Sequence, residues 1–453
     1  MMAVWSRVKF MDIFDGLDFA AEHYHPAKLV NLSRLINQGG LYVNDLVKPV
    51  RDTCAPSHEV PVFDLSAAHK HVLQVEDAYP DERVSIKKVA LGGDVIVSRL
   101  RSYLKQVAYI PETIQVANLS TEFIVLRSRN RSSIAFLVPF ILSEPIQTIL
   151  AWSQDGNEHP RFNEKVLLHI TIPPQVQSIS KKLNACVLKA TTSLDKALQA
   201  YSEAGQLLFR ELGFVELDLS PTLFYRRSYS ETCATARLDA EFYLPKYQRV
   251  LKALKRTRPE HIAPLGEYIS FLTNGHTPLH HDLVEGAVPF LTAENVFDFR
   301  IEYDTEKRIL TKHHKGELKR TQLRQGDCLI TIKGRIGNAA IAEDIPGQTN
   351  INQDVALFRL REGLPPYYLL AYLNSSVGKA FSNQYCTGQI NPFLGLGNLR
   401  LLPIAIYSPK RMESIAAKTR EVVMFARSAH DESRRLLEEA KQMVEEALLG
   451  NVK

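Results

Sequence analysis

Basic side chains cluster in two short segments that follow expected strands. The first segment contains Ser98, Arg99, Arg101, Tyr103 and Lys105. The second contains Lys333, Gly334 and Arg335. Guanidinium, ammonium and hydroxyl groups can hold phosphates, arginine can also pair with guanine, and glycine lets a backbone approach its ligand closely. A solvated basic turn is the alternative interpretation of both segments.

Amide, imidazole and hydroxyl side chains lie on other expected loops. They are Asn352, Gln353, Gln389, His276 and Thr277. Asparagine and glutamine amides can pair with adenine, but they can equally cap a turn. The neighbouring pair His280-His281 lacks a third and fourth ligand at metal spacing, so we expect a surface loop there and no metal site.

Catalytic motifs are not found in the sequence. There is no phosphate-binding G-x-x-x-x-G-K-[ST] loop, and Asn391-Pro392-Phe393 has neither a second proline nor an upstream glycine-rich cofactor loop. We find no convincing nucleophile and base pair. The sequence therefore predicts a chain that is not itself an enzyme.

Length and composition predict a soluble chain with several domains. The 453 residues exceed what one hydrophobic core organises, and the net charge of +5 permits nucleic-acid binding without demanding it. No apolar run reaches the roughly 20 residues that span a bilayer, and no secretory signal opens the chain. The five cysteines are far apart, which favours a reducing compartment and a cytoplasmic location.

An internal repeat organises the whole chain. Residues 5–26 align without a gap on residues 224–245, with Arg7/Arg226, Ala21/Ala240, Glu22/Glu241, Tyr24/Tyr243 and Pro26/Pro245 identical. Further matching segments follow in the same order: Val60-Pro61-Val62-Phe63 with Val288-Pro289-Phe290-Leu291, the Gly93-Asp94 segment with the Gly326-Asp327 segment, Asn118–Glu122 with Asn350–Asp354, and Gly156 and Pro160 with Gly388 and Pro392. A repeat of this size indicates two copies of one binding device.

Each half ends in a proline followed by a long helical pattern. Apolar residues recur every three or four positions in both patterns, which predicts one apolar seam on each helix. The residues that define the seams are Ile179, Leu183, Leu194, Tyr201, Leu208, Ile415, Val422, Leu436 and Met443. Gly213 and Gly450 stand where a helix is expected to end.

Four segments follow from the repeat and the two helices. They are a first mixed domain (1–174), a central helix (175–214), a second mixed domain (215–409) and a C-terminal helix (410–453). Each helix would be about 55 Å long, so the simplest way to bury both seams is an antiparallel coiled coil. The alternative is that each helix packs on its own domain. The predicted fold class is α/β (α+β), with two duplicated domains separated by two long antiparallel helices.

In this order and spacing, the motifs resemble the specificity (S) subunit of Type I DNA restriction–modification systems. The resemblance covers nearly the whole chain and is best in the second half. The segments that carry the resemblance are Asn274-Gly275-His276-Thr277-Pro278, Val288-Pro289-Phe290-Leu291, Gly326-Asp327-Cys328-Leu329, Lys333-Gly334-Arg335-Ile336-Gly337, Ile351-Asn352-Gln353-Asp354 and the segment from Leu399 to Pro409 that leads into the C-terminal helix. The first half departs from the pattern, because it lacks the G-x-T-P loop and has Arg101-Ser102-Tyr103 where Gly334 and Gly337 would fall.

The resemblance implies a fold and a role. Each mixed domain would be a target recognition domain that reads half of a split double-stranded DNA site. The paired helices would set the spacing between the two readers. The chain would direct two methyltransferase (modification) subunits and also restriction/translocase subunits, with S-adenosylmethionine and ATP bound by those partners and no cofactor on this chain.

Two other interpretations stay open at this point. A duplicated scaffold would use its coiled coil to join other proteins and would not bind DNA. An enzyme with an unrecognised motif would turn over substrate without a partner. Steep salt dependence of DNA binding distinguishes the first interpretation from these two, because phosphate neutralisation releases counterions.

Overall fold

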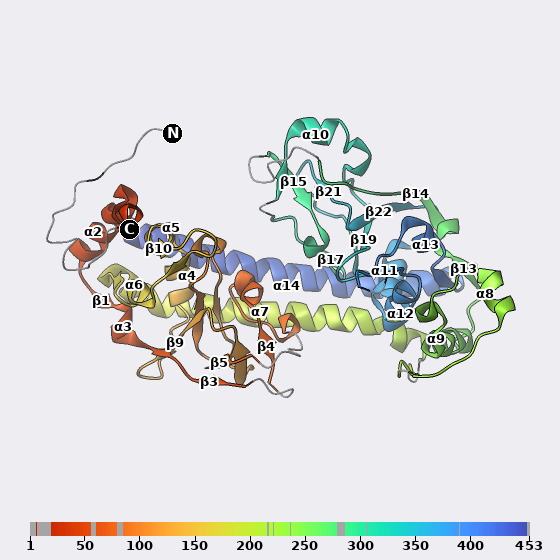
Figure 1. Ribbon diagram of the computed structural model, residues 1–453, viewed down its shortest axis with the longest axis horizontal. Helices are drawn as coiled ribbons and strands as arrows, with labels where there is room; N and C mark the ends of the chain where they lie inside the picture. Colours follow the sequence, from red (N-terminus) through yellow and green to blue (C-terminus); the bar gives the residue numbers. More distant parts are fainter. Residues whose placement is uncertain are drawn as a thin grey trace. The chain divides into compact units, whose positions relative to one another are not determined.

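The computed structural model describes residues 6, 20–55, 60–78, 85–214, 217–220, 222–235, 237–278, 286–305, 307–388 and 390–450. The chain forms two compact units. Unit 1 comprises residues 1–195 and 429–453, and unit 2 comprises residues 196–428. Two long helices, α7 (Pro174–Leu212) and α14 (Pro409–Leu449), each begin in one unit and end in the other (Figure 1).

Unit 1 is built on two four-stranded sheets, in the orders β2-β9-β6-β7 and β3-β5-β8-β4. The strands of these sheets are β2 (Val47–Val50), β3 (Thr53–Cys54), β4 (Val62–Phe63), β5 (Lys87–Leu91), β6 (Val95–Ser98), β7 (Val107–Tyr109), β8 (Val116–Leu119) and β9 (Phe123–Ser128). Smaller pairs are β1 (Leu41–Tyr42) with β12 (Thr171–Ile172), and β10 (Gln154–Asp155) with β11 (Arg161–Phe162). The helices are α2 (Pro26–Gln38), α3 (Val43–Leu46), α4 (Leu137–Leu142), α5 (Glu144–Ala151) and α6 (Glu164–Leu168).

The first sheet of unit 1 separates two hydrophobic cores. Successive side chains of a strand point to opposite faces, so Val95 and Val97 enter one core while Ile96 enters the other. The first of these cores also contains α7 and α14 residues, including Leu183 and Val444. The sheet is thereby fixed to both long helices within unit 1.

Unit 2 repeats this plan around a sheet in the order β14-β22-β19-β20, beside a three-stranded sheet, β18-β15-β21. The strands are β13 (His261–Pro264), β14 (Ile269–Asn274), β15 (Val288–Leu291), β16 (Val296–Phe297), β17 (Arg300–Ile301), β18 (Arg308–Ile309), β19 (Cys328–Thr331), β20 (Ala339–Ile341), β21 (Asn350–Ile351), β22 (Val355–Leu360) and β23 (Pro403–Ile406). The helices are α8 (Tyr229–Thr235), α9 (Pro245–Arg256), α10 (Thr311–Lys315), α11 (Pro366–Asn374), α12 (Ser376–Gln384) and α13 (Leu396–Arg400). Smaller strand pairs are β13 with β23 and β16 with β17.

The strand registers of the two units match the sequence repeat. In unit 1 the parallel pair β4/β8 aligns Val62 with Asn118 and Phe63 with Leu119. In unit 2 the parallel pair β15/β21 aligns Phe290 with Asn350 and Leu291 with Ile351. Both pairs join the same two segments of the repeat, so the fold is duplicated at the level of single residues.

An ion pair between a buried aspartate and a half-buried arginine recurs in both copies. The glycine of each Gly-Asp pair adopts a positive φ, 90° at Gly93 and 85° at Gly326, and turns the chain into the next strand. The following aspartate is buried and binds an arginine on the neighbouring strand, at 2.7 Å for Asp94–Arg127 and 2.6 Å for Asp327–Arg359. This turn and ion pair tie β6 to β9 and β19 to β22.

Within each unit, α7 and α14 pack in antiparallel directions. In unit 1, Lys189 forms an ion pair with Glu432 at 2.8 Å, and in unit 2 Glu211 forms one with Lys418 at 2.7 Å. Leu183, Leu194, Leu208, Ile415 and Leu436 are buried as the seam predicts. The long helices therefore pack both on each other and on the sheets, so the two alternatives considered for them hold together.

The seam needs one correction in α14. Val423 and Val444 are fully buried, whereas the predicted Val422 and Met443 are half-buried. An α-helix has 3.6 residues per turn, so a strict seven-residue repeat drifts around the helix surface and the buried position moves by one residue. In α7, Ile179 is half-buried and packs at the edge of the core, and Tyr201 is buried.

The loop of the first domain also uses left-handed backbone, although it has no glycine there. Gly334 and Gly337 have φ of 69° and 88°. In unit 1, Arg101 and Lys105 adopt left-handed conformations, with φ of 50° and 51°. Each costs a residue with a Cβ atom about 1–2 kcal/mol, so surrounding contacts must hold this loop in place.

Candidate nucleic-acid interface

Three segments converge at the end of β6 in unit 1. The loop after β6 contributes Arg99, the turn before β9 contributes Glu122, and the hairpin strand β11 contributes Arg161. Glu122 accepts hydrogen bonds from Arg161 Nη2 at 2.8 Å and from Arg99 Nε at 3.0 Å. These two guanidinium groups, Arg161 first, lower the pKa of Glu122 below its usual value. The carboxylate thus fixes two partly exposed arginines side by side.

The hairpin also holds the rest of the unit 1 loop. The backbone N–H of Arg101 donates to the Pro160 carbonyl at 2.8 Å, and its guanidinium donates to the Glu158 carbonyl at 3.3 Å. Tyr103 is 56% exposed and Lys105 is also exposed. Arg99, Tyr103 and Lys105 therefore present ring and cationic groups to solvent from a loop whose backbone is anchored.

The corresponding segments converge at the end of β19 in unit 2. Lys333 Nζ lies 3.7 Å from a carboxylate oxygen of Asp354, the residue that matches Glu122 in the repeat, and 5.3 Å from the ring centroid of Phe393. The Arg335 guanidinium carbon lies 4.9 Å from the Phe297 ring centroid. Lys333, Gly334 and Arg335 are all exposed, so this loop also displays cations supported by aromatic rings.

A half-buried lysine supports the loop of unit 2. Lys379 Nζ donates to Asp298 and to the side-chain oxygen of Asn338, both at 2.6 Å. Burial lowers the pKa of Lys379, while the Asp298 carboxylate raises it. A Cβ atom at Gly337 would lie 3.1 Å from the Ser382 side chain, so glycine permits this close packing.

Two predicted contact residues require correction. Ser98 is buried and its hydroxyl donates to the Leu100 carbonyl at 3.0 Å. Asn352 is buried and its amide donates to Asp354 at 2.7 Å. Both side chains shape their turns instead of facing a ligand, because small polar residues next to a turn readily bond to nearby polar groups.

The other predicted residues of unit 2 form a second, separate set of contacts. The Thr277 hydroxyl donates to the Gln353 side-chain oxygen at 2.7 Å, and His276 lies 3.1 Å from Glu317. Gln353 and His276 are partly exposed. Gln389, together with His280 and His281, lies outside the described residues.

Sequence reasoning missed Arg161 and Phe393, which occupy matching places next to the two basic loops. Each directly follows a proline of the repeat, Pro160 or Pro392. The match between Pro160 and Pro392 in the repeat is the sequence signal that could have identified this hairpin, although Arg161 and Phe393 differ in type. Backbone hydrogen bonds join the hairpin to the segment after the matching strand in both units, from the Phe162 N–H to the Arg99 carbonyl at 3.1 Å and from the Leu394 N–H to the Ile332 carbonyl at 3.0 Å.

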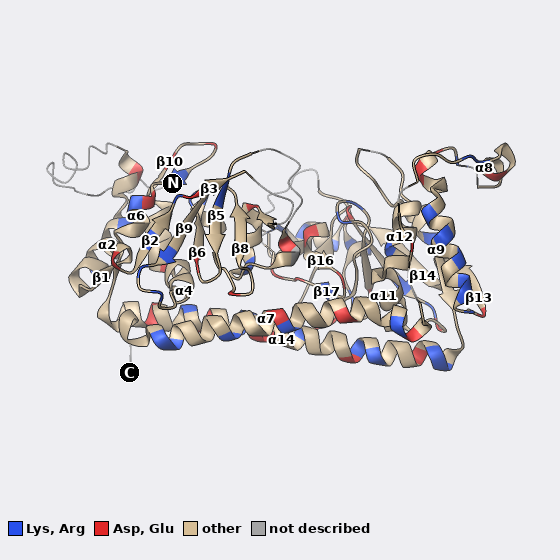
Figure 2. Cartoon of the chain, turned by 90° about the horizontal axis from the view of Figure 1, so that it is seen from below, with Lys and Arg blue, Asp and Glu red and all other residues tan. Residues whose placement is uncertain are grey.

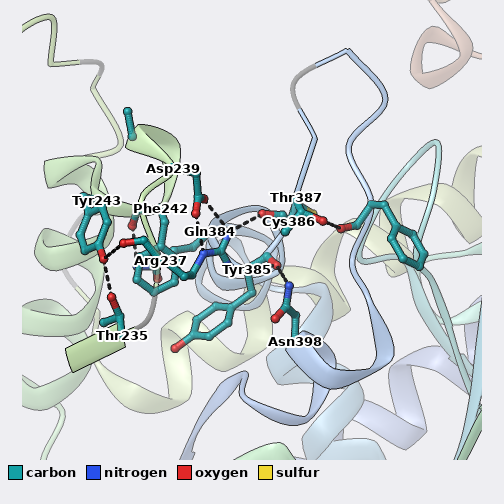
Figure 3. Close-up of polar contacts among 12 residues, drawn as sticks. Thr235, Arg237, Asp239, Phe242, Tyr243, Gln384, Tyr385, Cys386, Thr387 and Asn398 are labelled. Atoms are coloured by element: carbon teal, nitrogen blue, oxygen red, sulfur yellow. Dashed lines mark hydrogen bonds and ion pairs between the residues drawn. The ribbon is translucent and has the colours of Figure 1, made fainter. Parts of the chain in front are cut away.

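A polar network anchors this hairpin region of unit 2 (Figure 3). Arg237 forms an ion pair with Asp239 at 2.6 Å and donates to the Cys386 carbonyl at 2.8 Å. Its guanidinium lies over the Phe242 ring, 4.4 Å from the centroid. In unit 1, His23 lies 3.4 Å from Asp155 and thereby joins the corresponding two segments.

Basic residues also line one helix of unit 2. Helix α9 contains five lysines and arginines and no acidic residue, and they are blue in Figure 2. They are Lys246, Arg249, Lys252, Lys255 and Arg256. Its apolar residues Tyr247, Val250 and Leu254 are buried, so the basic residues occupy the remaining faces.

The described part of the chain contains no group of three or more His, Cys, Asp and Glu side chains that could hold a metal ion. None of its helices is both long and apolar enough to cross a membrane.

Three solved structures are similar to this chain. An S subunit from M. genitalium shares 11% identity, with a TM-score of 0.40, and the match covers 90% of this chain and 95% of that one. The HsdS subunit from Thermoanaerobacter tengcongensis shares 17% identity, with a TM-score of 0.30 and coverage of 91% and 96%. A chain from a structure describing complex assembly and conformational transition of the type I R-M system shares 18%, with a TM-score of 0.31 and coverage of 91% and 97%.

The chain resembles Type I specificity subunits. No protein-family model and no curated protein matches it.

Proposed function

We propose that the chain is the DNA-sequence specificity subunit of a Type I restriction–modification complex. Each unit would read one half of a bipartite double-stranded DNA site. The chain would direct methyltransferase and restriction/translocase subunits, which would bind S-adenosylmethionine and ATP, and it would catalyse no reaction itself.

The observation that supports this proposal most strongly is the duplicated basic loop. In each unit a cationic loop follows the matching strand, β6 or β19, and is bound by the matching carboxylate, Glu122 or Asp354. The neighbouring hairpin is hydrogen-bonded to the segment after the strand in both units. A scaffold protein would not need to keep cations and their supporting carboxylates at the same place in both copies.

The side chains at these loops suit the reading of duplex DNA. Arginine can bind guanine through two hydrogen bonds, and each good bidentate pair discriminates by about 1–3 kcal/mol. One small domain therefore selects only a short sequence, whereas two domains with additive readout select a rare site. The differences between Arg99, Arg101 and Arg161 in unit 1 and Lys333 and Arg335 in unit 2 support two different half-sites.

The proposal is tested by exchanging one domain at a time. Residues 1–174 are replaced by the equivalent segment of a relative with a known bipartite site, and methylated bases are mapped in host DNA. We expect one half-site to change while the other half-site and the spacing persist. A change in both half-sites would contradict separate reading by the two domains.

A further inference from the structure

The Phe297 ring in unit 2 contacts two arginines that differ in their surroundings. The guanidinium carbon of Arg335, on the exposed basic loop, lies 4.9 Å from the ring centroid. The guanidinium carbon of Arg300, which is buried, lies 4.5 Å from the same centroid. Cations over an aromatic ring are attracted by its negative face. One half-buried ring therefore joins the candidate DNA-contacting loop to the interior of unit 2.

The ring is carried by a short hairpin with little freedom to move. Strands β16 and β17 pair Phe297 directly with Arg300, and only Asp298 and Phe299 form the turn between them. Phe299 is fully buried although its φ is 65°, which is a left-handed conformation. Backbone strain of this kind persists only where the surrounding contacts determine the conformation.

Three contacts hold the turn of this hairpin. The Phe299 N–H donates to the Ala339 carbonyl at 2.9 Å, and the Arg427 guanidinium donates to the Phe299 carbonyl at 3.2 Å. The Lys379 ammonium group donates to the Asp298 carboxylate at 2.6 Å. Strand β20 and helices α12 and α14 thus fix the hairpin, and with it the position of the ring.

Arg300 connects the ring to the long helix α7. Its side chain is 8% exposed, and its Nη2 atom lies 2.9 Å from Glu302. Its Nε and Nη1 atoms are buried and have no hydrogen-bond partner among the described residues, which is costly for a charged group. The guanidinium carbon also lies 5.6 Å from the ring centroid of Tyr201 on α7. Attraction to two rings offsets part of the cost, so Arg300 links Phe297 to the helix.

Contact with a ring leaves the hydrogen-bond donors of Arg335 uncommitted. Arginine carries five N–H donors, and no described residue accepts a hydrogen bond from the side chain of Arg335. In unit 1, by contrast, Arg99 and Arg161 both donate to Glu122. A carboxylate support uses donors that could otherwise pair with a base, whereas a ring support does not. Arg335 therefore keeps the donors that bind the O6 and N7 atoms of guanine.

We propose that Phe297 is a specificity-determining positioning residue. Its ring holds the Arg335 guanidinium in place for bidentate pairing with one guanine of the half-site that unit 2 reads. This inference rests on the proposed function, because it names the base that one loop residue selects and the ring that orients this residue. A side chain held in place before binding loses less conformational freedom on binding. Removal of the ring should therefore weaken the recognition of that guanine alone.

The test uses the full chain in the assembled complex with its methyltransferase subunits. Fluorescence titrations measure affinity for the cognate duplex and for duplexes in which one base pair at a time is replaced in either half-site. Arg335→Ala should reduce discrimination at one G·C pair by about 10-fold or more. Phe297→Leu should reduce discrimination at the same pair by about 3- to 10-fold. Phe297→Tyr keeps the ring and should retain the wild-type discrimination.

Phe271→Leu is the matched control. Phe271 is also half-buried in unit 2, and the guanidinium carbon of Arg359 lies 4.7 Å from its ring centroid. That arginine is bound to the buried Asp327 and does not belong to the basic loop. We expect the control to leave discrimination at every base pair unchanged.

A double variant separates positioning from a general effect on stability. Phe297→Leu should add nothing to the effect of Arg335→Ala, because the ring acts through that arginine. An additive effect, or uniform weakening at all base pairs by Phe297→Leu, would assign the ring to stability and overturn the proposal.

Failure of the proposed function gives a different result. A wild-type complex that binds DNA without sequence preference would contradict the proposed function itself. If Arg335→Ala alters one G·C pair while Phe297→Leu alters none, only the positioning role is overturned. If the wild type is specific but Arg335→Ala alters no base pair, the inference also fails, and the proposed function stands.

A second variant guards against unfolding. Phe297→Met fills much of the same space with a flexible apolar chain but has no ring. We expect a melting temperature within about 2 °C of the wild type and the same loss of discrimination at the G·C pair. A folded Phe297→Met complex with full discrimination would overturn the proposal. Unfolding of both the leucine and the methionine variants would also overturn it, because the ring would then serve stability.

Discussion

Removing the buried aspartate of one repeat should destabilise that unit alone. Asp327 accepts hydrogen bonds from Arg359 Nε at 2.6 Å and Nη2 at 3.2 Å, and from the Arg324 backbone N–H at 2.8 Å. In Asp327→Ala the arginine loses its counter-charge and the N–H loses its acceptor. Deleting one partner of a fully buried pair costs about 3–5 kcal/mol.

The cost here should be smaller, because the Arg359 side chain is 26% exposed and can hydrate. We therefore expect a loss of about 2–4 kcal/mol in the free energy of unfolding of unit 2. For a unit of this size, that corresponds to a fall in Tm of roughly 5–12 °C.

Calorimetry combined with hydrogen exchange measures the effect unit by unit. Exchange should speed up in β19 and β22 but not in β6 and β9, and Asp94→Ala should give the opposite pattern. Glu362→Ala is the control, because it removes an exposed carboxylate from unit 2. A melting temperature of unit 2 within about 2 °C of the wild type in Asp327→Ala would refute the reasoning.

Three further predictions concern pH and the basic loops. Burial lowers the pKa of His71 to about 4, and its ring donates a hydrogen bond to the Val107 carbonyl. As pH falls, His71 therefore takes up a proton in the unfolded chain before it does so in the folded chain. The free energy of unfolding of unit 1 should fall by up to about 3 kcal/mol between roughly pH 6.5 and pH 4. Denaturant titrations should show that His71→Asn abolishes this loss, and a loss of the same size in the variant would contradict the assignment. Arg101→Gly removes a cation and relieves a left-handed backbone, but this gain is offset by the freedom of glycine in the unfolded chain and by the lost bond to the Glu158 carbonyl. The free energy of unfolding should therefore change by less than about 1 kcal/mol, while DNA affinity falls and the salt slope of binding decreases by about 1. A folded variant with undiminished DNA affinity would remove Arg101 from the interface. Arg335→Ala should leave the free energy of unfolding unchanged, but it should reduce sequence specificity at one half-site or weaken DNA binding by about 1–3 kcal/mol in fluorescence titrations of the assembled complex. Unchanged specificity and affinity would exclude Arg335 from the DNA interface.

Much of the fold could be predicted because the relevant signals are local. The apolar seams, and the glycines expected to follow them, predicted α7 and α14, which end at Leu212 and Leu449. The repeat alignment predicted which segments correspond, and the parallel pairs β4/β8 and β15/β21 follow that alignment residue by residue. These successes rest on periodicity and turn chemistry, which neighbouring residues determine.

The candidate site was less predictable because it depends on contacts between distant segments. Composition alone placed Ser98 and Asn352 among ligand-facing residues, whereas each side chain is buried and bonded within its own turn. Arg161 joins Arg99 only because strand pairing brings the hairpin to the end of β6. Nothing local in the sequence around Glu122 indicates that it binds both arginines.

The most direct test of the central claim is the map of methylated bases in DNA from cells that express the complex, compared with cells lacking this chain. We predict a bipartite motif of two specified blocks separated by a fixed number of unspecified base pairs, and its disappearance when the chain is absent. A single contiguous motif, or an unchanged map without the chain, would contradict the account.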